Sequence, residues 1–541
     1  MDEGQPQPAA QPSQPVEQKP AEKPKKKFSL NLDLARVSEF FPSVIKPELK
    51  LTFNEKMKWT GIILLLFYVL GSVTVWGIDP NAVARFEFLE IVFGSKMGSL
   101  LTLGIGPIVT ASIILQLLVG SKVLGWDTKT AEGKKKFMGT QKMLAVLFCV
   151  FEAAAYVLAG AVPPAGGGMA VAALVITQMA LGGFLVMLMD EVTTKWGIGS
   201  GVSLFIAAGV AKTIMVRVFN PLTASGTLPT AEEGASGLIP GFFTYLGAGN
   251  PGQAFLLLFP LISTATVFFI VVFAQAMRIE IPMAISFFGG KLGSRRWPIK
   301  FIYTSNIPVI LTAAVLANLQ VATRMLADRG LTFFGTYDKQ GTALGGLAYY
   351  LSAPYSTSLM VVAVFGGVLA MAAALLAAKY LKKFVLRSAT AGAIAGILLG
   401  VMLLAGLGMP SVASDDWMRA LTYMSIMITG STIFSIFWVA TAGMDAKSVA
   451  EQFQSTFLML PGFRKDPRII ESVLERYIPS LTVLGGAFIG LLAGFADLTN
   501  ALGTGTGILL TVMIVYQLYE QLIQQHSEDM PPMAKKFFGI E

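Results

Sequence analysis

Cysteine, histidine and charge are scarce in this chain of 541 residues, and each scarcity excludes a class of chemistry. The single cysteine, Cys149, lies inside an apolar stretch, so an internal disulfide cannot form and a thiolate metal site is not expected. The single histidine, His526, lies in a hydrophilic terminal segment, which argues against histidine-based catalysis. We find no phosphate-binding glycine loop and no nucleophile with a base, so we expect no enzyme activity, no cofactor and no metal.

Apolar residues dominate what is present. Only 14% of the residues are charged and 54% are hydrophobic, which is more apolar surface than a water-soluble core needs. Many apolar stretches approach the ~20 residues that cross the hydrocarbon of a bilayer. We predict about twelve membrane spans, at residues 58–77, 106–121, 137–161, 168–190, 200–216, 254–276, 300–318, 357–380, 388–408, 418–440, 478–496 and 505–524.

The two terminal segments are hydrophilic. Residues 1–27 are mostly Pro, Gln, Glu, Ala and Lys, so no cleavable signal peptide is expected and residues 1–36 are predicted to be a disordered tail. Its basic run, Lys25 to Lys27, either attracts anionic lipid or is simply solvated. Apolar positions at helical spacing predict an amphipathic interfacial helix over residues 37–57, and residues 525–541 form a second hydrophilic tail.

Lys and Arg alternate between the loops in a way that orients the chain. With the N-terminus inside, the predicted inner loops hold Lys122, Lys129, Lys134 to Lys136, Lys195, Arg278, Lys291, Arg295, Arg296, Lys300, Lys379, Lys382, Lys383, Arg387, Arg464, Lys465, Arg468 and Arg476. The outer loops 161–168 and 497–504 contain neither Lys nor Arg. Basic residues collect on the cytoplasmic side of membrane proteins. We therefore predict a multi-pass protein of the cell membrane with both termini in the cytoplasm.

A stretch between the first two spans is apolar but interrupted. Residues 83–104 contain Glu87, Glu90 and Lys96, and the stretch is too polar and short for a full span. Such a segment is tolerated at membrane depth only inside protein, so we predict a re-entrant helix. The motif Gly104-Ile-Gly106-Pro107 should end it before the next span.

A glycine pattern occurs twice. Gly197-Ile-Gly199-Ser-Gly201 precedes one span and Gly503-Thr-Gly505-Thr-Gly507 precedes another, and the predicted topology enters the first from inside and the second from outside. This arrangement is typical of inverted-topology repeats, which place a transport pathway between two halves. The alternative is that each glycine pattern only permits close helix packing.

Several motifs together resemble the SecY family in its archaeal form, over roughly residues 47–541. They are Lys58-Trp59-Thr60-Gly61, the run Leu101 to Thr110 with Ser112 to Gly120, Asp190-Glu191 with residues 196–201, Arg278-Ile-Glu-Ile-Pro282, Pro298-Ile-Lys300, Ser305 to Ile310, Phe437-Trp438, Gly462-Phe-Arg-Lys465, Arg476-Tyr-Ile-Pro479, and Gly505-Thr-Gly507 with Tyr516 and Tyr519-Glu520. The resemblance implies an all-α polytopic membrane protein, a clamshell of two inverted five-helix halves around an hourglass pore.

The resemblance also implies domain boundaries and one departure from the family. The N-terminal half would be 58–218 with a plug at about 85–103, and the C-terminal half would start over 219–356 and resume over 411–524. Between them, residues 357–410 form an additional transmembrane hairpin that the usual ten-span pattern lacks. Because the additional spans come as a pair, they leave the orientation of all later spans unchanged.

Three groups of site residues carry over by resemblance. An apolar pore ring would comprise Ile105, Val109, Val202, Ile206, Ile310 and Leu510; a polar cluster at a lateral gate would comprise Thr110, Glu152 and Asn318; and ribosome docking would use Arg295, Arg296, Arg464 and Lys465. Ordinary packing explains the ring residues equally well without the resemblance, and the docking residues also serve topology. A carboxylate in mid-span such as Glu152 is costly, so it should face a partner or water.

The function implied is that of a passive channel that conducts secretory polypeptides and releases membrane helices sideways into lipid. The implied partners are a SecE or gamma-type subunit, a small beta-type or SecG subunit, the ribosome, signal sequences and nascent polypeptides, and membrane lipids. A secondary transporter for a small solute would share inverted repeats and broken helices, but such a transporter generally needs several buried ionisable groups. Glu152 is nearly alone in mid-span here.

Overall fold

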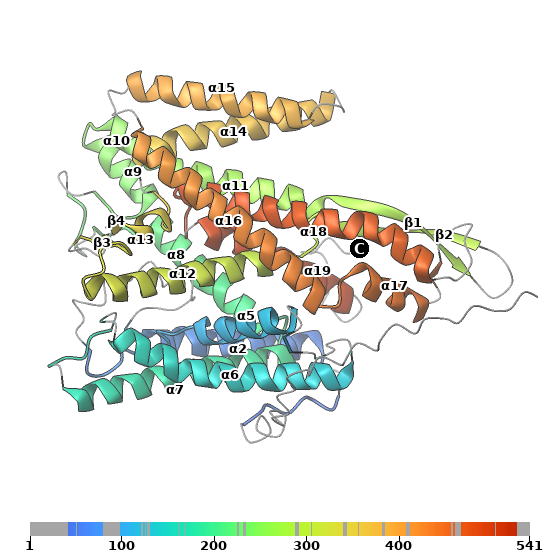
Figure 1. Ribbon diagram of the computed structural model, residues 1–541. Helices are drawn as coiled ribbons and strands as arrows, with labels where there is room; N and C mark the ends of the chain where they lie inside the picture. Colours follow the sequence, from blue (N-terminus) through green and yellow to red (C-terminus); the bar gives the residue numbers. More distant parts are fainter. Residues whose placement is uncertain are drawn as a thin grey trace, which may run out of the picture. The chain divides into compact units, whose positions relative to one another are not determined.

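Every predicted span coincides with a helix in the computed structural model (Figure 1). The structure describes residues 42–526 except 50, 79–97, 121–122, 125, 127–129, 159, 161, 167, 224–226, 231–233, 287–291, 305, 339–342, 355, 381–384, 407–411, 456–457, 460–466 and 504. The N-terminal half contains α2 (Phe53–Ser72), α5 (Gly106–Gly120), α6 (Ala131–Leu158), α7 (Met169–Trp196) and α8 (Gly201–Phe219). The C-terminal half contains α9 (Leu238–Gly247), α10 (Pro251–Leu256), α11 (Phe259–Ala276), β1 (Arg278–Ser286), β2 (Leu292–Lys300), α12 (Ile307–Asp328), β3 (Thr336–Tyr337), β4 (Ala343–Gly345), α13 (Leu347–Tyr350), α14 (Thr357–Tyr380), α15 (Val385–Gly406), α16 (Ser414–Thr441), α17 (Ala446–Ser455), β5 (Leu458–Met459), α18 (Pro467–Leu498) and α19 (Gly505–His526).

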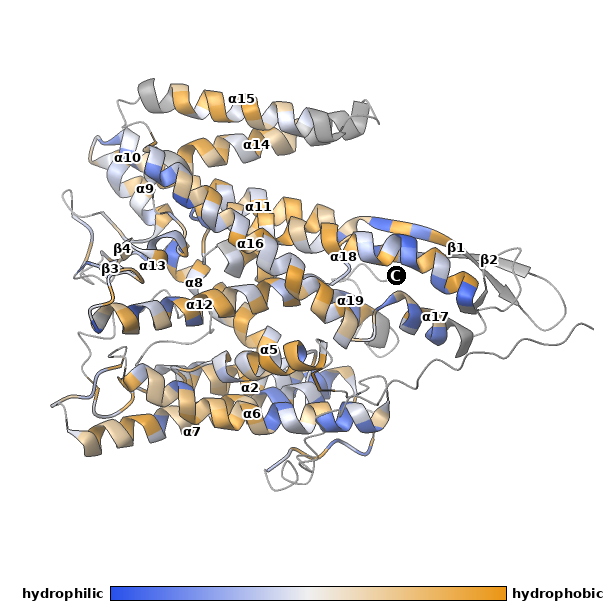
Figure 2. Ribbon diagram, in the orientation of Figure 1, coloured by the Kyte–Doolittle hydropathy of each residue, from blue (hydrophilic) through white to orange (hydrophobic). Residues whose placement is uncertain are grey.

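Eight helices among the described residues are long and apolar enough to cross a membrane. The other predicted spans fall on α2, whose first two turns are charged, on the 15-residue α5, and on α14 and α15. At 1.5 Å per residue α5 covers only about 22 Å, less than the ~30 Å of a bilayer core. Figure 2 shows hydrophilic residues at the start of α6, along α17 and at the start of α18, with long apolar stretches elsewhere.

The interfacial helix predicted over 37–57 is absent over residues 42–49 and 51–52, and residues 53–57 form the start of α2. Residues 42–47 have no regular structure, and a bend at 48–49 precedes α2. Pro42 and Pro47 lack the backbone N–H that a helix needs, and a proline disfavours helical geometry in the residue before it. Helix α2 begins instead at a capping box, in which the Glu55 amide donates to Thr52 Oγ1 and the Thr52 amide donates to Glu55 Oε2.

The carbonyl groups of this extended segment are bound by side chains of the N-terminal half. Lys142 Nζ donates to the Pro42 carbonyl at 2.8 Å, and Trp196 Nε1 donates to the Ile45 carbonyl at 2.8 Å. Lys195 Nζ donates to the carbonyl of Val44. These bonds give the segment the partners that a helix would otherwise have supplied. The predicted tail at 1–36 and residues 37–41 lie outside the described residues. The predicted tail at 525–541 also lies outside them except for residues 525 and 526, which end α19.

Two halves of the described chain meet along two seams. Within the N-terminal half α6 packs on α5 and α7, and within the C-terminal half α16 packs on α18. One seam lies between α8 and α19, near the connection from α8 to α9; the other lies where α5 meets α12 and α16. A single apolar cluster contains residues of both halves, so the two are joined by shared core packing rather than by a linker alone.

A hairpin of strands, which the sequence analysis did not predict, ends at the first residue of the span predicted at 300–318. β1 pairs antiparallel with β2 from Arg278↔Lys300 to Ser286↔Leu292, and after bends and turns at 301–304 and 306 the helix of this span begins at Ile307. On its other edge β1 pairs with β5 at Ala284↔Met459. The segment before α12 and the segment after α17 therefore form one sheet, in the order β2-β1-β5.

The additional hairpin consists of α14 and α15, which lie side by side (Figure 1). Glycines on α15 face the backbone of α14: a Cβ on Gly396 would lie 2.3 Å from the Phe365 carbonyl oxygen. Helix α14 in turn contacts α11 and α18 of the C-terminal half. The small residues thus allow the close helix packing that their abundance predicts.

Candidate functional site

The residues predicted as the pore ring all belong to one apolar cluster that joins the two halves. Ile105, Val109, Ile206 and Leu510 are buried members of the cluster, and Val202 and Ile310 are partly buried residues packed against it. Val109, Val202, Ile206, Ile310 and Leu510 lie in the first two turns of α5, α8, α12 or α19, and Ile105 directly precedes α5. The ring residues therefore gather where four helices begin.

Helices α8 and α19 begin in the same way, at the two glycine repeats. Asp190 Oδ1 accepts a hydrogen bond from the Val202 amide at 2.8 Å, and Asp497 Oδ1 accepts one from the Thr506 amide at 3.3 Å. A carboxylate from the preceding helix thus accepts a hydrogen bond from an amide in the first turn of each repeat helix. The sequence analysis missed both aspartates, although each lies six or seven residues before the first glycine of its repeat.

The glycines of the repeats allow this close approach. Gly199 and Gly503 have φ values of 73° and 77°, which favour glycine. A Cβ on Gly201 would lie 2.5 Å from Asp190 Cα. The glycine with positive φ lies two residues before its helix in both halves, although it is the second glycine of the first motif and the first glycine of the second. The glycines therefore permit tight packing, and relative to the helix starts the two motifs are offset by two residues.

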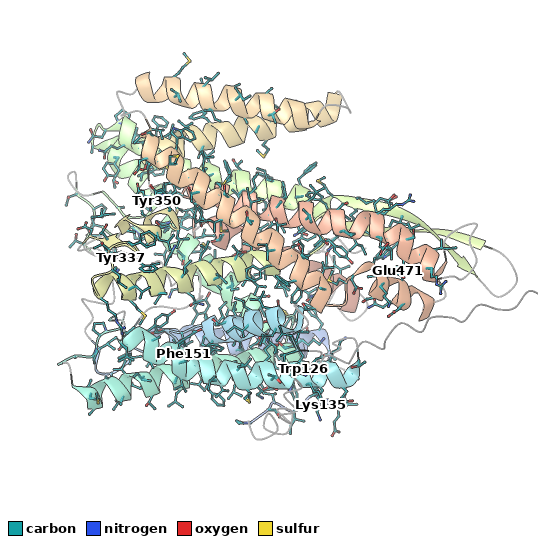
Figure 3. All side chains as sticks on the ribbon, viewed as in Figure 1. Trp126, Lys135, Phe151, Tyr337, Tyr350 and Glu471 are labelled. Carbon is teal, nitrogen blue, oxygen red and sulfur yellow. The ribbon has the colours of Figure 1, made fainter. Side chains whose placement is uncertain are left out.

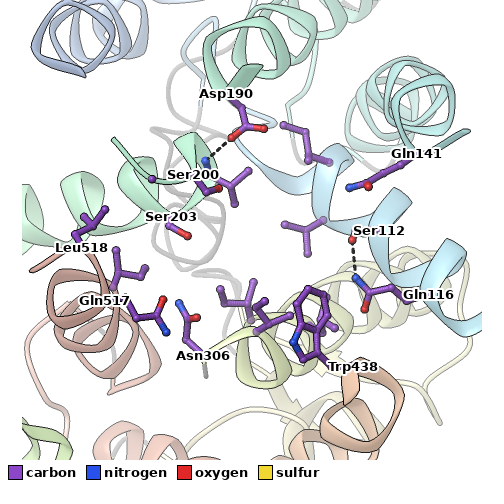
Figure 4. Close-up of a pocket in the computed structure, with 18 of the residues that line it drawn as sticks. Ser112, Gln116, Gln141, Asp190, Ser200, Ser203, Asn306, Trp438, Gln517 and Leu518 are labelled. Atoms are coloured by element: carbon purple, nitrogen blue, oxygen red, sulfur yellow. Dashed lines mark hydrogen bonds between the residues drawn. The ribbon is translucent and has the colours of Figure 1, made fainter. Parts of the chain in front are cut away.

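A cavity of about 380 Å³ lies directly against the ring (Figure 4). Val109, Val202 and Ile310 of the ring form part of its wall. The remaining lining residues are apolar or uncharged polar groups except for Asp190: Ile108, Ser112, Gln116, Gln141, Gly199, Ser200, Ser203, Asn306, Ile307, Leu311, Trp438, Ile514, Gln517, Leu518 and Gln521. Gln116 Nε2 donates to Ser112 Oγ at 2.8 Å. Such a wall can be wetted but offers few charged groups that would hold a solute tightly.

The three residues of the predicted gate cluster come together across the second seam. Thr110 Oγ1 on α5 donates to Glu152 Oε1 on α6 at 2.7 Å. Asn318 Nδ2 on α12 donates to the same Thr110 oxygen at 3.4 Å, which is the longer bond and the one that crosses between the halves. Glu152 is 7% exposed, and among the described residues its Oε2 has no hydrogen-bond partner. A buried unpaired oxygen is costly, because it has given up its hydrogen bonds to water without replacing them.

The predicted docking residues are only partly described. Arg295 and Arg296 lie on β2, opposite Met283 and Pro282 of β1. Arg464 and Lys465 lie outside the described residues, next to β5. β1 pairs with both β2 and β5. One sheet therefore includes strands from the loop that contains Arg295 and Arg296 and from the loop that contains Arg464 and Lys465, which we call the first and second docking loops.

A tyrosine holds the base of this sheet to the second docking loop. The Tyr303 hydroxyl, in the turn after β2, donates to the Met444 carbonyl at 2.7 Å. Burial raises the pKa of Tyr303 to about 12, with a smaller contribution from Asp445. The hydroxyl therefore keeps its proton and goes on donating at neutral pH.

The predicted plug is described only at its end. Residues 79–97 lie outside the described residues, whereas residues 98–105 form turns in which Leu101 and Leu103 are buried. The Leu100 amide donates to the Val73 carbonyl at 2.8 Å. A Cβ on Gly182 of α7 would lie 1.7 Å from the Leu100 carbonyl oxygen, so α7 holds this turn through direct backbone contact.

Comparisons with known proteins agree with this geometry. The SecY family model matches residues 99–519. Protein translocase subunit SecY of Methanococcus vannielii is 39% identical over 503 residues, covering 93% of this chain and 98% of the relative. A solved structure of a protein conducting channel is 38% identical with a TM-score of 0.71, covering 92% of this chain and 99% of the other. Sec61 in the canine ribosome-channel complex from the endoplasmic reticulum is 37% identical with a TM-score of 0.68, again covering 92% and 99%. The chain belongs to the SecY family of protein-translocase subunits.

Proposed function

We propose that this chain is the central pore-forming subunit of a Sec protein translocase. It conducts secretory polypeptides across the membrane and releases membrane-protein helices sideways into lipid, as a passive channel without enzyme activity. One observation carries the proposal: six aliphatic residues, from helix starts in both halves, gather in one cluster against a cavity with a largely uncharged wall.

The ring suits a channel that must pass many sequences without leaking ions. Aliphatic groups at a narrow waist disfavour water and therefore ions. They also part around a peptide without hydrogen-bonding to any one side chain. The ring residues are carried by α5 and α8 from one half and by α12 and α19 from the other, so a small separation of the halves widens the waist.

The second seam suits lateral release. It lies between α5 on one side and α12 and α16 on the other, and Thr110 and Asn318 provide its polar contact. A hydrogen bond in the low dielectric of the membrane holds the seam without locking it, because the bond from Asn318 to Thr110 is long. A hydrophobic signal sequence entering the seam replaces helix contacts with its own.

We place both termini in the cytoplasm and assign the ribosome as the source of driving force. Figure 3 has Lys135 and Glu471 at one end of the helices and Tyr337 and Tyr350 at the other, so the basic loops share one end. The ribosome follows from the likeness to a channel solved in a ribosome complex. A SecE or gamma-type subunit and a small beta-type or SecG subunit complete the proposed assembly, with lipids around it.

Crosslinking of a stalled secretory nascent chain tests the proposal. A photoreactive residue at Val109 or at Ile310 should crosslink to the chain, because both lie at the ring. The matched control is Phe269 on α11, whose side chain is 60% exposed and should face lipid. No crosslink at either ring position, with the ribosome shown to be engaged, contradicts the proposal and favours a transporter for a small solute.

A further inference from the structure

The base of the β1–β2 hairpin is held by one carboxylate of the last helix. Glu520 on α19 contacts both Arg278, the first residue of β1, and Lys300, the last residue of β2. Arg278 Nη2 lies 3.3 Å from Glu520 Oε1, and Lys300 Nζ contacts Oε2. The two cations are register partners in the hairpin. A single carboxylate therefore binds both strands at the point where they leave the membrane-spanning helices.

This carboxylate is well placed to transmit force. The Glu520 side chain is only 18% exposed, less than either cation. Lys300 Nζ also lies 5.8 Å from the ring centre of Tyr516, one helical turn before Glu520. Two oxygens of one side chain thus face two cations, and an aromatic ring supports one of them.

Helix α19 has the pore on another of its faces. Leu510 belongs to the ring cluster, and Ile514, Gln517 and Gln521 line the cavity beside it. Glu520 follows Leu510 by ten residues, which is about 15 Å along a helix. The same rigid element therefore carries a ring residue and the anchor of the hairpin.

The hairpin is joined to the helices by strand pairing and by a shared buried cluster. Hydrogen bonds join β1 to β2 and to β5, and Ile281 and Ile299 are buried in a cluster with residues of α16, α17 and α18. At its base the Phe301 amide donates to the Met277 carbonyl at 2.9 Å. A load on the sheet therefore reaches α16, α17 and α18 through this cluster, and it reaches α19 through the contacts of Glu520 and Tyr516 at the base.

We infer that Glu520 is the positioning residue that couples a partner docked on the β2-β1-β5 sheet to the pore helix α19. This rests on the proposed function, in which the ribosome docks on these loops. A docked partner shifts the channel only if its contacts differ between the closed and the open arrangement. The ion pairs of Glu520 supply that difference. Movement of the sheet shifts Arg278 and Lys300, and Glu520 follows these two cations and moves α19 with it.

The test uses the whole complex, reconstituted in lipid with ribosomes that carry a stalled secretory chain. Two quantities are measured: ribosome affinity, and the yield of crosslinks from position 109 to the nascent chain per bound ribosome. Glu520→Gln keeps the shape and removes the charge. We expect its ribosome affinity to stay within about twofold, and its crosslink yield to fall by roughly fivefold, in the range of modest allosteric couplings.

Three further variants sharpen the result. Glu475→Gln, an exposed carboxylate on α18, should leave both quantities unchanged. Glu520→Lys should lose the yield, and adding Lys300→Glu should restore it, because one anion again faces two cations. Recovery in the double variant also shows that the single variant had not simply failed to fold.

The outcomes separate the two ideas. Glu520→Gln with normal binding and a normal crosslink yield contradicts the coupling alone, as does a double variant that does not recover. If Glu520→Gln instead weakens ribosome binding while the crosslink yield per bound ribosome stays normal, Glu520 belongs to the docking surface and the coupling is wrong. A wild-type complex that binds no ribosome contradicts the proposed function, and the inference falls with it.

Discussion

Removing the Asn318 side chain should make the channel open more readily. Asn318→Ala deletes the one hydrogen bond of the polar cluster that crosses the seam, between Asn318 Nδ2 and Thr110 Oγ1. The bond between Thr110 and Glu152 stays, since α5 and α6 both belong to the N-terminal half. The substitution therefore weakens the closed seam without taking apart either half.

The size of the effect follows from the geometry. At 3.4 Å the bond is longer than the usual 2.7–3.2 Å, so we place its net contribution at about 0.5–1 kcal/mol, in the lower part of the usual range. This free energy is lost from the closed state only. The ratio of open to closed channels should rise about twofold to fivefold.

Single-channel recording of the reconstituted complex in planar bilayers measures this ratio directly. Gln320→Ala is the matched control, because Gln320 lies on the same helix and donates a bond of 2.9 Å to the Leu351 carbonyl within the C-terminal half. We expect no change in open probability for this control. An unchanged open probability in Asn318→Ala, or an equal rise in Gln320→Ala, would refute the reasoning.

Three other variants test separate features. Replacing Ile105, Val109 and Val202 with Ser should increase ion leak through proteoliposomes, because hydroxyl groups hydrate the waist. Asp190→Ala should lower the free energy of unfolding by about 1 kcal/mol, as for other lost caps, and a thermal melt measures the loss. Gly182→Ala should destabilise by about 1–3 kcal/mol, because its Cβ would lie 1.7 Å from a backbone oxygen.

Each of these three variants has a control substitution that is measured in the same assay. Serine at exposed, membrane-facing Leu484 should cause no leak, and an equal leak there would remove the special role of the ring. Asp190→Asn keeps an oxygen acceptor, so it should melt close to the wild type. Gly61→Ala has open space on α2 and should gain up to about 1 kcal/mol in stability; a loss as large as that of Gly182→Ala contradicts the steric argument.

The sequence predicted the helices well because a membrane span has a strong local signal. A run of about twenty apolar residues needs no knowledge of distant contacts. The helix prediction was wrong for the segment at 42–47. Its apolar residues have helical spacing, but Pro42 and Pro47 disfavour a helix there. The strand β1 was missed although its signal is local too: Ile279 and Ile281 alternate with polar Arg278 and Glu280, as in a half-buried strand.

The site was less accessible from the sequence, because its groups are far apart in the chain. The ring and gate residues came from resemblance to a family, and the structure brings them together without testing their roles. The caps on α8 and α19 and the contacts of Glu520 were not anticipated. Glu520 and Arg278 are separated by 242 residues, so no local pattern places them side by side.

The additional hairpin illustrates how a channel can gain helices without a new core. None of its described residues belongs to the ring cluster, and α14 rests on α11 and α18 at the edge of one half. Without the hairpin, apolar residues like Phe259 would face lipid tails, which are as apolar as a leucine side chain. In a bilayer the surface beneath α14 is therefore satisfied by a helix or by lipid alike, so the hairpin can be present or absent without a change in the ring cluster.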